Sequence, residues 1–163
     1  MNIVKQYNDY GAPHQTPKSI IIHAMAEYLS IDGGHQWMKA ADFLKHTGLS
    51  AHALVAPDGT VYRCRKDNEG AYHAAGFNTD SLGIEIMVSG KHDYSSFLHT
   101  ILHRYTTEAQ YSALVEQVRE WIKRYSITDI KRHSDVSPGR KIDPGAGFDW
   151  EKFLEDVKNE KTA

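Results

Sequence analysis

Ser19-Ile20-Ile21-Ile22-His23 predicts a short buried strand near the start of the chain. Three consecutive β-branched apolar residues, preceded by Pro17, are typical of such a strand. A polar imidazole at the C-terminal end of a buried strand is held rigidly at the edge of a sheet, where binding sites usually form. We therefore expect the strand to end at His23 and this histidine to be a candidate site residue.

The rest of the chain mixes strand and helix signals. The apolar run from Leu82 to Val88 predicts another strand, and Asp58-Gly59 between apolar runs predicts a hairpin. The clearest helix begins near Thr107, which forms a capping-box pattern with Gln110 ahead of an apolar stripe that continues to Tyr125. Weaker patterns predict a helix over residues 35–46, a closing helix over 148–157, a loop or a weak element over 90–103, and a loop over 133–147.

These elements predict an α/β fold, with a single domain over residues 1–163 and a central mixed β-sheet flanked by helices. The core is expected over about residues 17–157, with a tail over 158–163. The chain has 19 Lys and Arg against 21 Asp and Glu, and this balance excludes a strongly basic nucleic-acid-binding module. A single cysteine, Cys64, excludes an internal disulfide framework and a cysteine-rich metal site.

Ten histidines raise the question of which ones carry chemistry, since histidine is the most common metal ligand. A proline-containing loop near the C-terminus carries His133, Lys141 and Asp143. Two imidazoles and one carboxylate, from His23, His133 and Asp143, would form a familiar zinc set with a fourth position left open. A carboxylate inside an apolar run, as at Glu85, is costly to bury unless it is paired or used. These residues lie far apart along the chain, so spacing alone does not establish a site.

Six segments occur in an order that is typical of one enzyme family. They are Ile20-Ile21-Ile22-His23, Ser50–Val55, Asp58-Gly59, Tyr72-His73-Ala74, Ser81–Glu85 and His133–Gly145. Together they resemble the zinc-dependent N-acetylmuramoyl-L-alanine amidases of the amidase-2 type, which include the peptidoglycan recognition proteins and small phage lysozymes. The resemblance extends from about Ser19 to Phe153, nearly the whole chain.

The resemblance implies a role for each candidate residue. A zinc ion would be held by His23, His133 and Asp143. Lys141 would polarise the scissile carbonyl, and Glu85 would act as the general base. Glu85 would take a proton from the attacking water and hand it to the departing alanine nitrogen, so no covalent enzyme intermediate is required.

Two further residues, His73 and Asn78, are predicted to contact the substrate. A structural hydrogen bond for His73 and a turn role for Asn78 are the alternatives. Some family members use a tyrosine just before the histidine of the second strand and a cysteine as the third metal ligand. This chain has Ala51 and Asp143 at those places, so it resembles the bacterial branch with a strand glutamate, which here is Glu85.

The resemblance implies hydrolysis of the amide bond between N-acetylmuramic acid and L-alanine in peptidoglycan. No signal peptide is recognisable and no segment approaches the roughly 20 apolar residues of a membrane span, so we expect synthesis in a cytoplasm and no stable membrane binding. These features favour a monomeric, bacteriolytic phage endolysin that degrades the cell wall from the periplasm after release. A cytoplasmic amidase that recycles muropeptides and a non-catalytic peptidoglycan-binding module are the alternatives.

Overall fold

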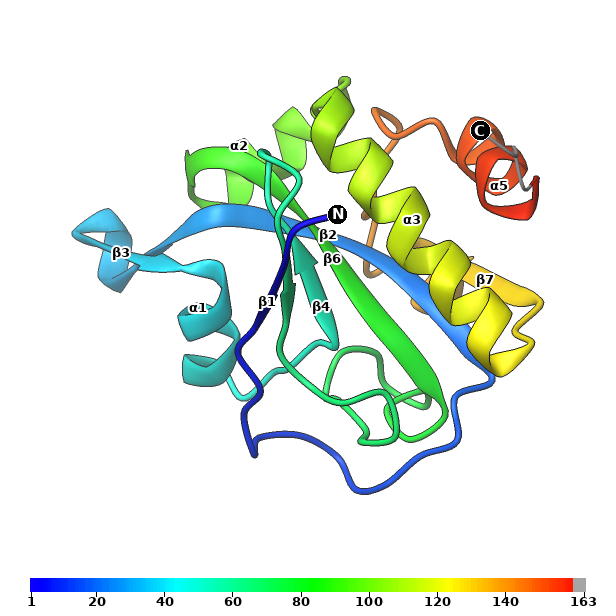
Figure 1. The fold of residues 1–163 in the computed structure, drawn as a ribbon. Coiled ribbons are helices and arrows are strands. Elements are labelled where there is room, and N and C mark those ends of the chain that lie inside the picture. The colour runs from blue at the N-terminus through cyan, green and yellow to red at the C-terminus, as the bar shows by residue number, and fades with distance from the viewer. Residues whose placement is uncertain (160–163) are drawn as a thin grey trace.

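The computed structural model describes residues 1–159, whose seven strands form one mixed β-sheet (Figure 1). Six strands lie in the order β1-β5-β4-β6-β2-β3, and β7 also pairs with β2. The sheet confirms the predicted α/β fold. The strands are β1 (Ile3–Lys5), β2 (Ser19–Ile31), β3 (Gln36–Lys39), β4 (Ala53–Val55), β5 (Val61–Arg63), β6 (Ser81–His92) and β7 (Asp129–Arg132).

Strand β2 pairs with three other strands of the sheet. It runs parallel to β6, while its first residues pair with β7 and its last residues pair with β3. The predicted strand end at His23 is therefore wrong, since β2 continues to Ile31. The residues after Ala26 carry a weaker apolar signal because they are half-buried, and pairing with β3 and β6 extends the strand through them.

Helices surround the sheet, and they confirm some predictions and correct others. They are the 3-10 helix η1 (Asp32–Gly34) and the α-helices α1 (Ala40–His46), α2 (Tyr94–Thr100), α3 (Glu108–Tyr125), α4 (His133–Val136) and α5 (Trp150–Lys158). The capping box of Thr107 and Gln110 is present at the start of α3, as predicted. The closing helix is also confirmed, as α5. Within the predicted tail, Lys158 ends α5 and residues 160–163 lie outside the described residues.

Three predicted segments differ from the structure. The helix expected over residues 35–46 begins only at Ala40, because the residues before it pair with β2. The segment 90–103, expected to be a loop or a weak element, contains α2, whose first turn is capped by the Asp93 side chain and whose Phe97 is buried. The loop expected over 133–147 opens with α4. Burial of apolar side chains stabilises short helices that are marginal by themselves.

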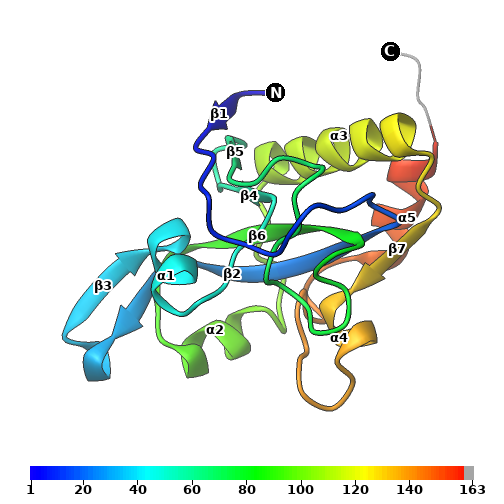
Figure 2. The same cartoon turned by 90° about the horizontal axis from the view of Figure 1, so that it is seen from below.

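The two faces of the sheet bury different side chains, because successive residues of a strand point to opposite faces. One cluster joins even-numbered residues of β2 and β6, such as Ile22 and Ile84, to Leu114 and Trp121 of α3. The other cluster joins odd-numbered residues of the same strands, such as Met25, to α1. In the view of Figure 2, α3 lies above the ribbons of β2 and β6 and α2 lies below them, while Phe97 of α2 belongs to the same cluster as α3.

Within residues 1–159, no helix is both long and apolar enough to cross a membrane.

Candidate metal centre and active site

The register of the sheet brings the first site residues together. In the parallel pair of β2 and β6, His23 lies opposite Glu85. On the other edge of β2, Arg132 is the last residue of β7 and lies opposite Ile22. His133 follows directly and begins α4, so it comes next to His23. Three residues that are far apart in the sequence thus meet on the odd-numbered side of β2.

Asp143 completes this group from the loop after α4. The backbone N–H of Ser134 donates to the Asp143 carbonyl over 3.1 Å, which folds the loop back onto α4. The Asp143 carboxylate also accepts a 3.1 Å hydrogen bond from the Ala24 backbone N–H. Ala24 lies in the part of β2 between the segments paired with β7 and β3, so its N–H is available to the loop.

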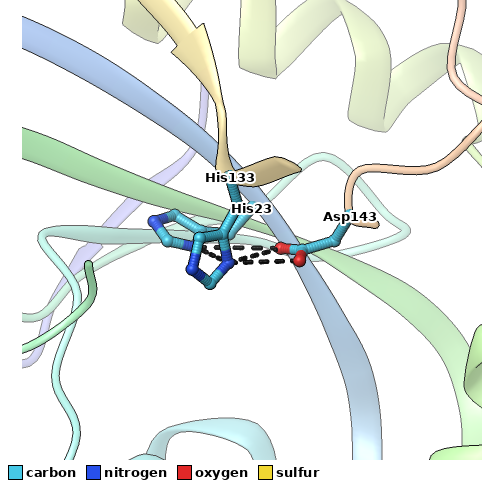
Figure 3. Close-up of side chains that lie close together, drawn as sticks. All are labelled: His23, His133 and Asp143. Carbon is cyan, nitrogen blue, oxygen red and sulfur yellow. Dashed lines mark hydrogen bonds and ion pairs between the residues drawn. The ribbon is translucent and has the colours of Figure 1, made fainter. Parts of the chain in front are cut away.

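The side chains of His23, His133 and Asp143 converge on one point (Figure 3). The Nδ1 atoms of the two histidines are 3.0 Å apart, and His133 Nδ1 is 3.1 Å from the Asp143 carboxylate. The distance from His23 Nδ1 to Asp143 Oδ2 is 3.7 Å. One nitrogen or oxygen atom from each residue lies within 4.8 Å of the others, and all three residues are buried.

These donors fit a divalent metal ion. Electron-pair donors this close repel one another unless a proton or a cation lies between them. Two imidazole nitrogens and a carboxylate oxygen are ligands that zinc accepts, and a three-ligand protein set is typical of catalytic zinc sites. All three donors are buried and lie close together without any protein cation between them among the atoms of this group. The group can therefore hold a metal ion.

Glu85 lies beside this group, with its Oε1 atom 3.8 Å from His23 Nδ1. Its other carboxylate oxygen is buried and has no hydrogen-bond partner among the described residues. Burial raises the pKa of Glu85 well above its usual range, the nearby Asp143 raises it further, and Lys141 opposes the shift. A carboxyl group whose pKa is raised holds a proton more readily than an exposed one, as a group that must both accept and return a proton requires.

A cavity of about 210 Å³ opens onto these groups. Glu85, Lys141 and the three candidate metal ligands line it. Apolar side chains that also line the cavity are exposed, namely Leu49, Tyr72, Tyr94 and Ile142. The Lys141 ammonium lies 5.9 Å from the centre of the Tyr94 ring, within cation–π range. The cavity therefore combines a charged interior with apolar exposed surface.

The two residues predicted to contact the substrate occupy different positions. His73 is buried and lines the cavity, but both of its ring nitrogens already have partners, His23 Nε2 at 2.8 Å and Ser81 Oγ at 2.9 Å. Asn78 is not among the described residues that line the cavity, and its side-chain oxygen accepts the backbone N–H groups of His73 and Ala74. Substrate contact by these two residues stays a prediction.

Sequence reasoning misses two features of this site. Tyr94 lies on α2, in a segment predicted as a loop or a weak element. The signal that could have found it is Asp93 as an N-cap ahead of Phe97 and Ile101 at helical spacing. Ser81, which contacts His73 from the start of β6, leaves no sequence signal, because the contact depends on how the preceding loop folds.

Buried His52 provides a pH-dependent contribution to stability. The Gly83 N–H donates to its Nδ1, and its Nε2–H donates to the Glu69 carbonyl. Burial lowers the pKa of His52 to about 4. The unfolded chain therefore binds more protons than the folded one between about pH 4 and the ordinary histidine pKa near 6.5. The stabilisation is complete above pH 6.5 and is lost as the pH falls through this window.

We expect the unfolding free energy of the wild type to fall more steeply with decreasing pH than that of His52→Asn, whose side-chain oxygen can still accept the Gly83 N–H. The difference in slope should be at most one proton, about 1.4 kcal/mol per pH unit. Urea unfolding at several pH values between 4 and 7 measures it, with His46→Asn as an exposed-histidine control. Equal slopes in the wild type and His52→Asn would contradict the assignment.

Comparisons with known proteins agree with this geometry. The sequence pattern of the Amidase_2 family, described as N-acetylmuramoyl-L-alanine amidase, matches residues 13–146. The 1,6-anhydro-N-acetylmuramyl-L-alanine amidase AmpD of Haemophilus influenzae is 35% identical over 121 residues, which cover 68% of this chain and 59% of that protein. The chain thus spans less than two thirds of the length of this relative.

Two other similarities cover almost the whole chain. The endolysin of Enterobacteria phage T3 is 29% identical over 152 residues, which cover 91% of each protein. The solved structure of the N-acetylmuramoyl-L-alanine amidase LysC from Clostridium intestinale is 26% identical and superimposes with a TM-score of 0.72, covering 97% of this chain and 98% of that one. The fold seen here is therefore that of known amidases along its entire described length.

Proposed function

The chain belongs to the N-acetylmuramoyl-L-alanine amidase family, and from that membership we propose that it cleaves peptidoglycan. The bond cleaved is the amide that joins the lactyl group of N-acetylmuramic acid to the L-alanine of the stem peptide. The observation that carries the proposal is the convergence of His23, His133 and Asp143 beside Glu85 in one cavity. A peptidoglycan-binding module without activity would not need three candidate metal ligands beside a buried carboxylate.

We propose zinc as the metal, held by His23, His133 and Asp143. The buried, three-residue donor set supports this choice, because two histidines and one carboxylate are typical of catalytic zinc sites. When bound, zinc polarises a carbonyl oxygen and lowers the pKa of water to about 7.

Glu85 is the general base in this proposal. It lies opposite His23 in the sheet, so its carboxylate faces the same space as the metal-binding atoms. Glu85 takes a proton from the attacking water while the C–O bond forms at the amide carbonyl. It then delivers this proton to the alanine nitrogen as the C–N bond breaks. The raised pKa of Glu85 suits a group that must both accept and return a proton.

Lys141 stabilises the negative charge that develops on the carbonyl oxygen. It is two residues before Asp143 in the same loop, and it lines the same cavity. A fixed positive charge in a partly buried site stabilises a developing oxyanion more strongly than one in open water. The cation–π contact with Tyr94 restricts where the Lys141 side chain lies.

We propose that the protein acts as an endolysin on the cell wall after release from the cytoplasm. The similarity to the phage T3 endolysin supports this role, because it covers 91% of both chains. The second candidate is recycling of soluble anhydro-muropeptides in the cytoplasm. It is favoured by the higher identity of 35% to the AmpD protein of Haemophilus influenzae, although that similarity covers only 59% of the relative.

Mass spectrometry of digestion products separates these functions. Purified sacculi and soluble anhydro-muropeptides are each incubated with the protein, with and without a metal chelator. We expect free stem peptides from sacculi, with release abolished by the chelator and restored by added zinc. Cleavage of soluble muropeptides alone would contradict the endolysin role and support recycling. Cleavage of neither substrate would contradict the amidase proposal.

A further inference from the structure

A buried chain of hydrogen bonds runs from β6 to the candidate metal centre. Ser81 Oγ donates to the Phe77 carbonyl over 2.6 Å and lies 2.9 Å from His73 Nε2. The other ring nitrogen of His73, Nδ1, lies 2.8 Å from His23 Nε2. His23 Nδ1, at the far end of the chain, faces His133 and Asp143. Every link from Ser81 to His23 is buried.

The direction of each hydrogen bond follows from the first donor. A hydroxyl has one hydrogen, and that of Ser81 is used by the Phe77 carbonyl, so Ser81 Oγ must accept from His73 Nε2–H. A neutral imidazole carries one hydrogen, which leaves a lone pair on His73 Nδ1. His23 therefore donates its Nε2–H to this lone pair. The remaining nitrogen of His23, Nδ1, is left without a hydrogen.

The surroundings of His23 Nδ1 agree with the tautomer that carries its hydrogen on Nε2. Glu85 and Asp143 are the carboxylates nearest to it, at 3.8 and 3.7 Å, and both distances exceed a normal hydrogen bond. Neither carboxylate therefore holds a hydrogen on His23 Nδ1. His133 Nδ1, at 3.0 Å, can donate to the same lone pair as long as no metal ion takes its place.

The backbone is shaped to hold His73 in this position. Gly83 lies on β6 between Ser81 and Glu85, and a Cβ atom added there would come within 2.5 Å of His73 Nδ1. The His73 ring consequently lies directly against the β6 backbone, where any larger residue would displace it. Asn78 fixes the other side, because its side-chain oxygen accepts the backbone N–H groups of His73 and Ala74.

We infer that His73 is a positioning residue that holds His23 in the Nε2–H tautomer and so presents the His23 Nδ1 lone pair to the metal. Ser81 determines which nitrogen of His73 accepts, and Gly83 makes room for its ring. A hydrogen-bonded partner of this kind commonly contributes 10–100-fold to metal affinity, since it fixes both the tautomer and the ring orientation. The inference rests on the proposed metal centre, and it gives His73 a role that does not require contact with substrate.

Nitrogen-15 NMR of the metal-free wild type tests the tautomer directly. Protonated and unprotonated imidazole nitrogens have well-separated nitrogen-15 chemical shifts. The tautomer of each ring can therefore be read once the signals of His23 and His73 are identified by their loss in His23→Gln and His73→Gln. We expect His23 with its hydrogen on Nε2 and its Nδ1 unprotonated. A His23 ring with its hydrogen on Nδ1 would overturn the inference. This readout does not depend on amidase activity or on zinc binding, so its failure is distinguishable from failure of the proposed function.

Zinc affinity, measured by competition with a chromophoric chelator, tests the consequence. His73→Leu removes the acceptor for His23 Nε2–H and should weaken zinc binding by about 10–100-fold. His73→Asn places an oxygen near the position of Nδ1 and should restore most of the affinity. The matched control is the exposed His46→Asn, which should bind zinc like the wild type.

Wild-type affinity in folded His73→Leu would overturn the inference, as would equal losses in the leucine and asparagine variants. Circular dichroism establishes folding before affinities are compared. If His73→Leu does not fold, Ser81→Ala takes its place. This variant leaves the His73 ring in its position but removes the group that decides which nitrogen accepts. It should give a mixture of His23 tautomers in the NMR spectrum, and a single unchanged Nε2–H tautomer would contradict the role of Ser81 in the chain.

Discussion

Glu85→Gln is expected to lower kcat for stem-peptide release by about 10²–10⁴-fold, the range that a general acid–base group contributes. Glutamine keeps the shape of the side chain but cannot take a proton from water. Glu85 Oε2 has no hydrogen-bond partner among the described residues, so the exchange breaks no hydrogen bond at that atom. The reaction rate on sacculi and the zinc content of the purified variant are the two measurements.

Zinc binding should survive in Glu85→Gln, because Glu85 lies beside the three proposed ligands and is not one of them. Glu27→Gln is the matched control. Glu27 is on β2, and its carboxylate accepts the Gly90 N–H, a hydrogen bond that a glutamine oxygen can keep. The control should retain wild-type activity. Full activity in Glu85→Gln would show that another group is the base.

Removal of a metal ligand should abolish both zinc binding and activity. His133→Ala leaves only His23 and Asp143 to hold the ion, and a catalytic zinc site normally needs three protein ligands. We therefore expect an affinity loss larger than the 10–100-fold that removal of a supporting hydrogen bond causes. Sacculus cleavage should fall to background. Zinc content by elemental analysis and product release by mass spectrometry measure the two effects.

The control for His133→Ala is His99→Ala. His99 is exposed and its ring lies 5.5 Å from that of His103, so this pair could bind zinc weakly at the surface. Loss of the His99 ring should leave stoichiometric zinc and full activity. Retention of tightly bound zinc by His133→Ala, together with its loss in His99→Ala, would place the metal at the surface pair and contradict the centre described here.

Much of the fold is predictable from local patterns. The β-branched run at Ser19–Ile22 and the capping box at Thr107 both lie in the elements expected from them. The Asp58-Gly59 hairpin also forms, with Gly59 at a φ of +88° that favours glycine. These signals are strong because each depends on neighbouring residues. The helix α2 was not predicted, since its Phe97 is buried by parts of the chain that are remote in sequence.

The candidate site is predictable only in part. Residue types and the order of the segments single out His23, Glu85, His133, Lys141 and Asp143, and all five line one cavity. The roles assigned to them stay predictions until the variants above are made. The Ser81–His73 contact could not be foreseen, because it depends on a turn held by Asn78 and on the space beside Gly83.

Sequence patterns alone therefore determined the class of fold, the start of β2 and the chemical types available for a site. Tertiary structure decided which of the ten histidines meet. Strand register places His23 opposite Glu85 and brings the end of β7 alongside, and register is set by the packing of two faces of a sheet rather than by any local signal. Tertiary structure also decided which nitrogen of His23 faces His133 and Asp143 in the candidate metal centre, because that choice follows from hydrogen bonds between residues that are distant in the chain.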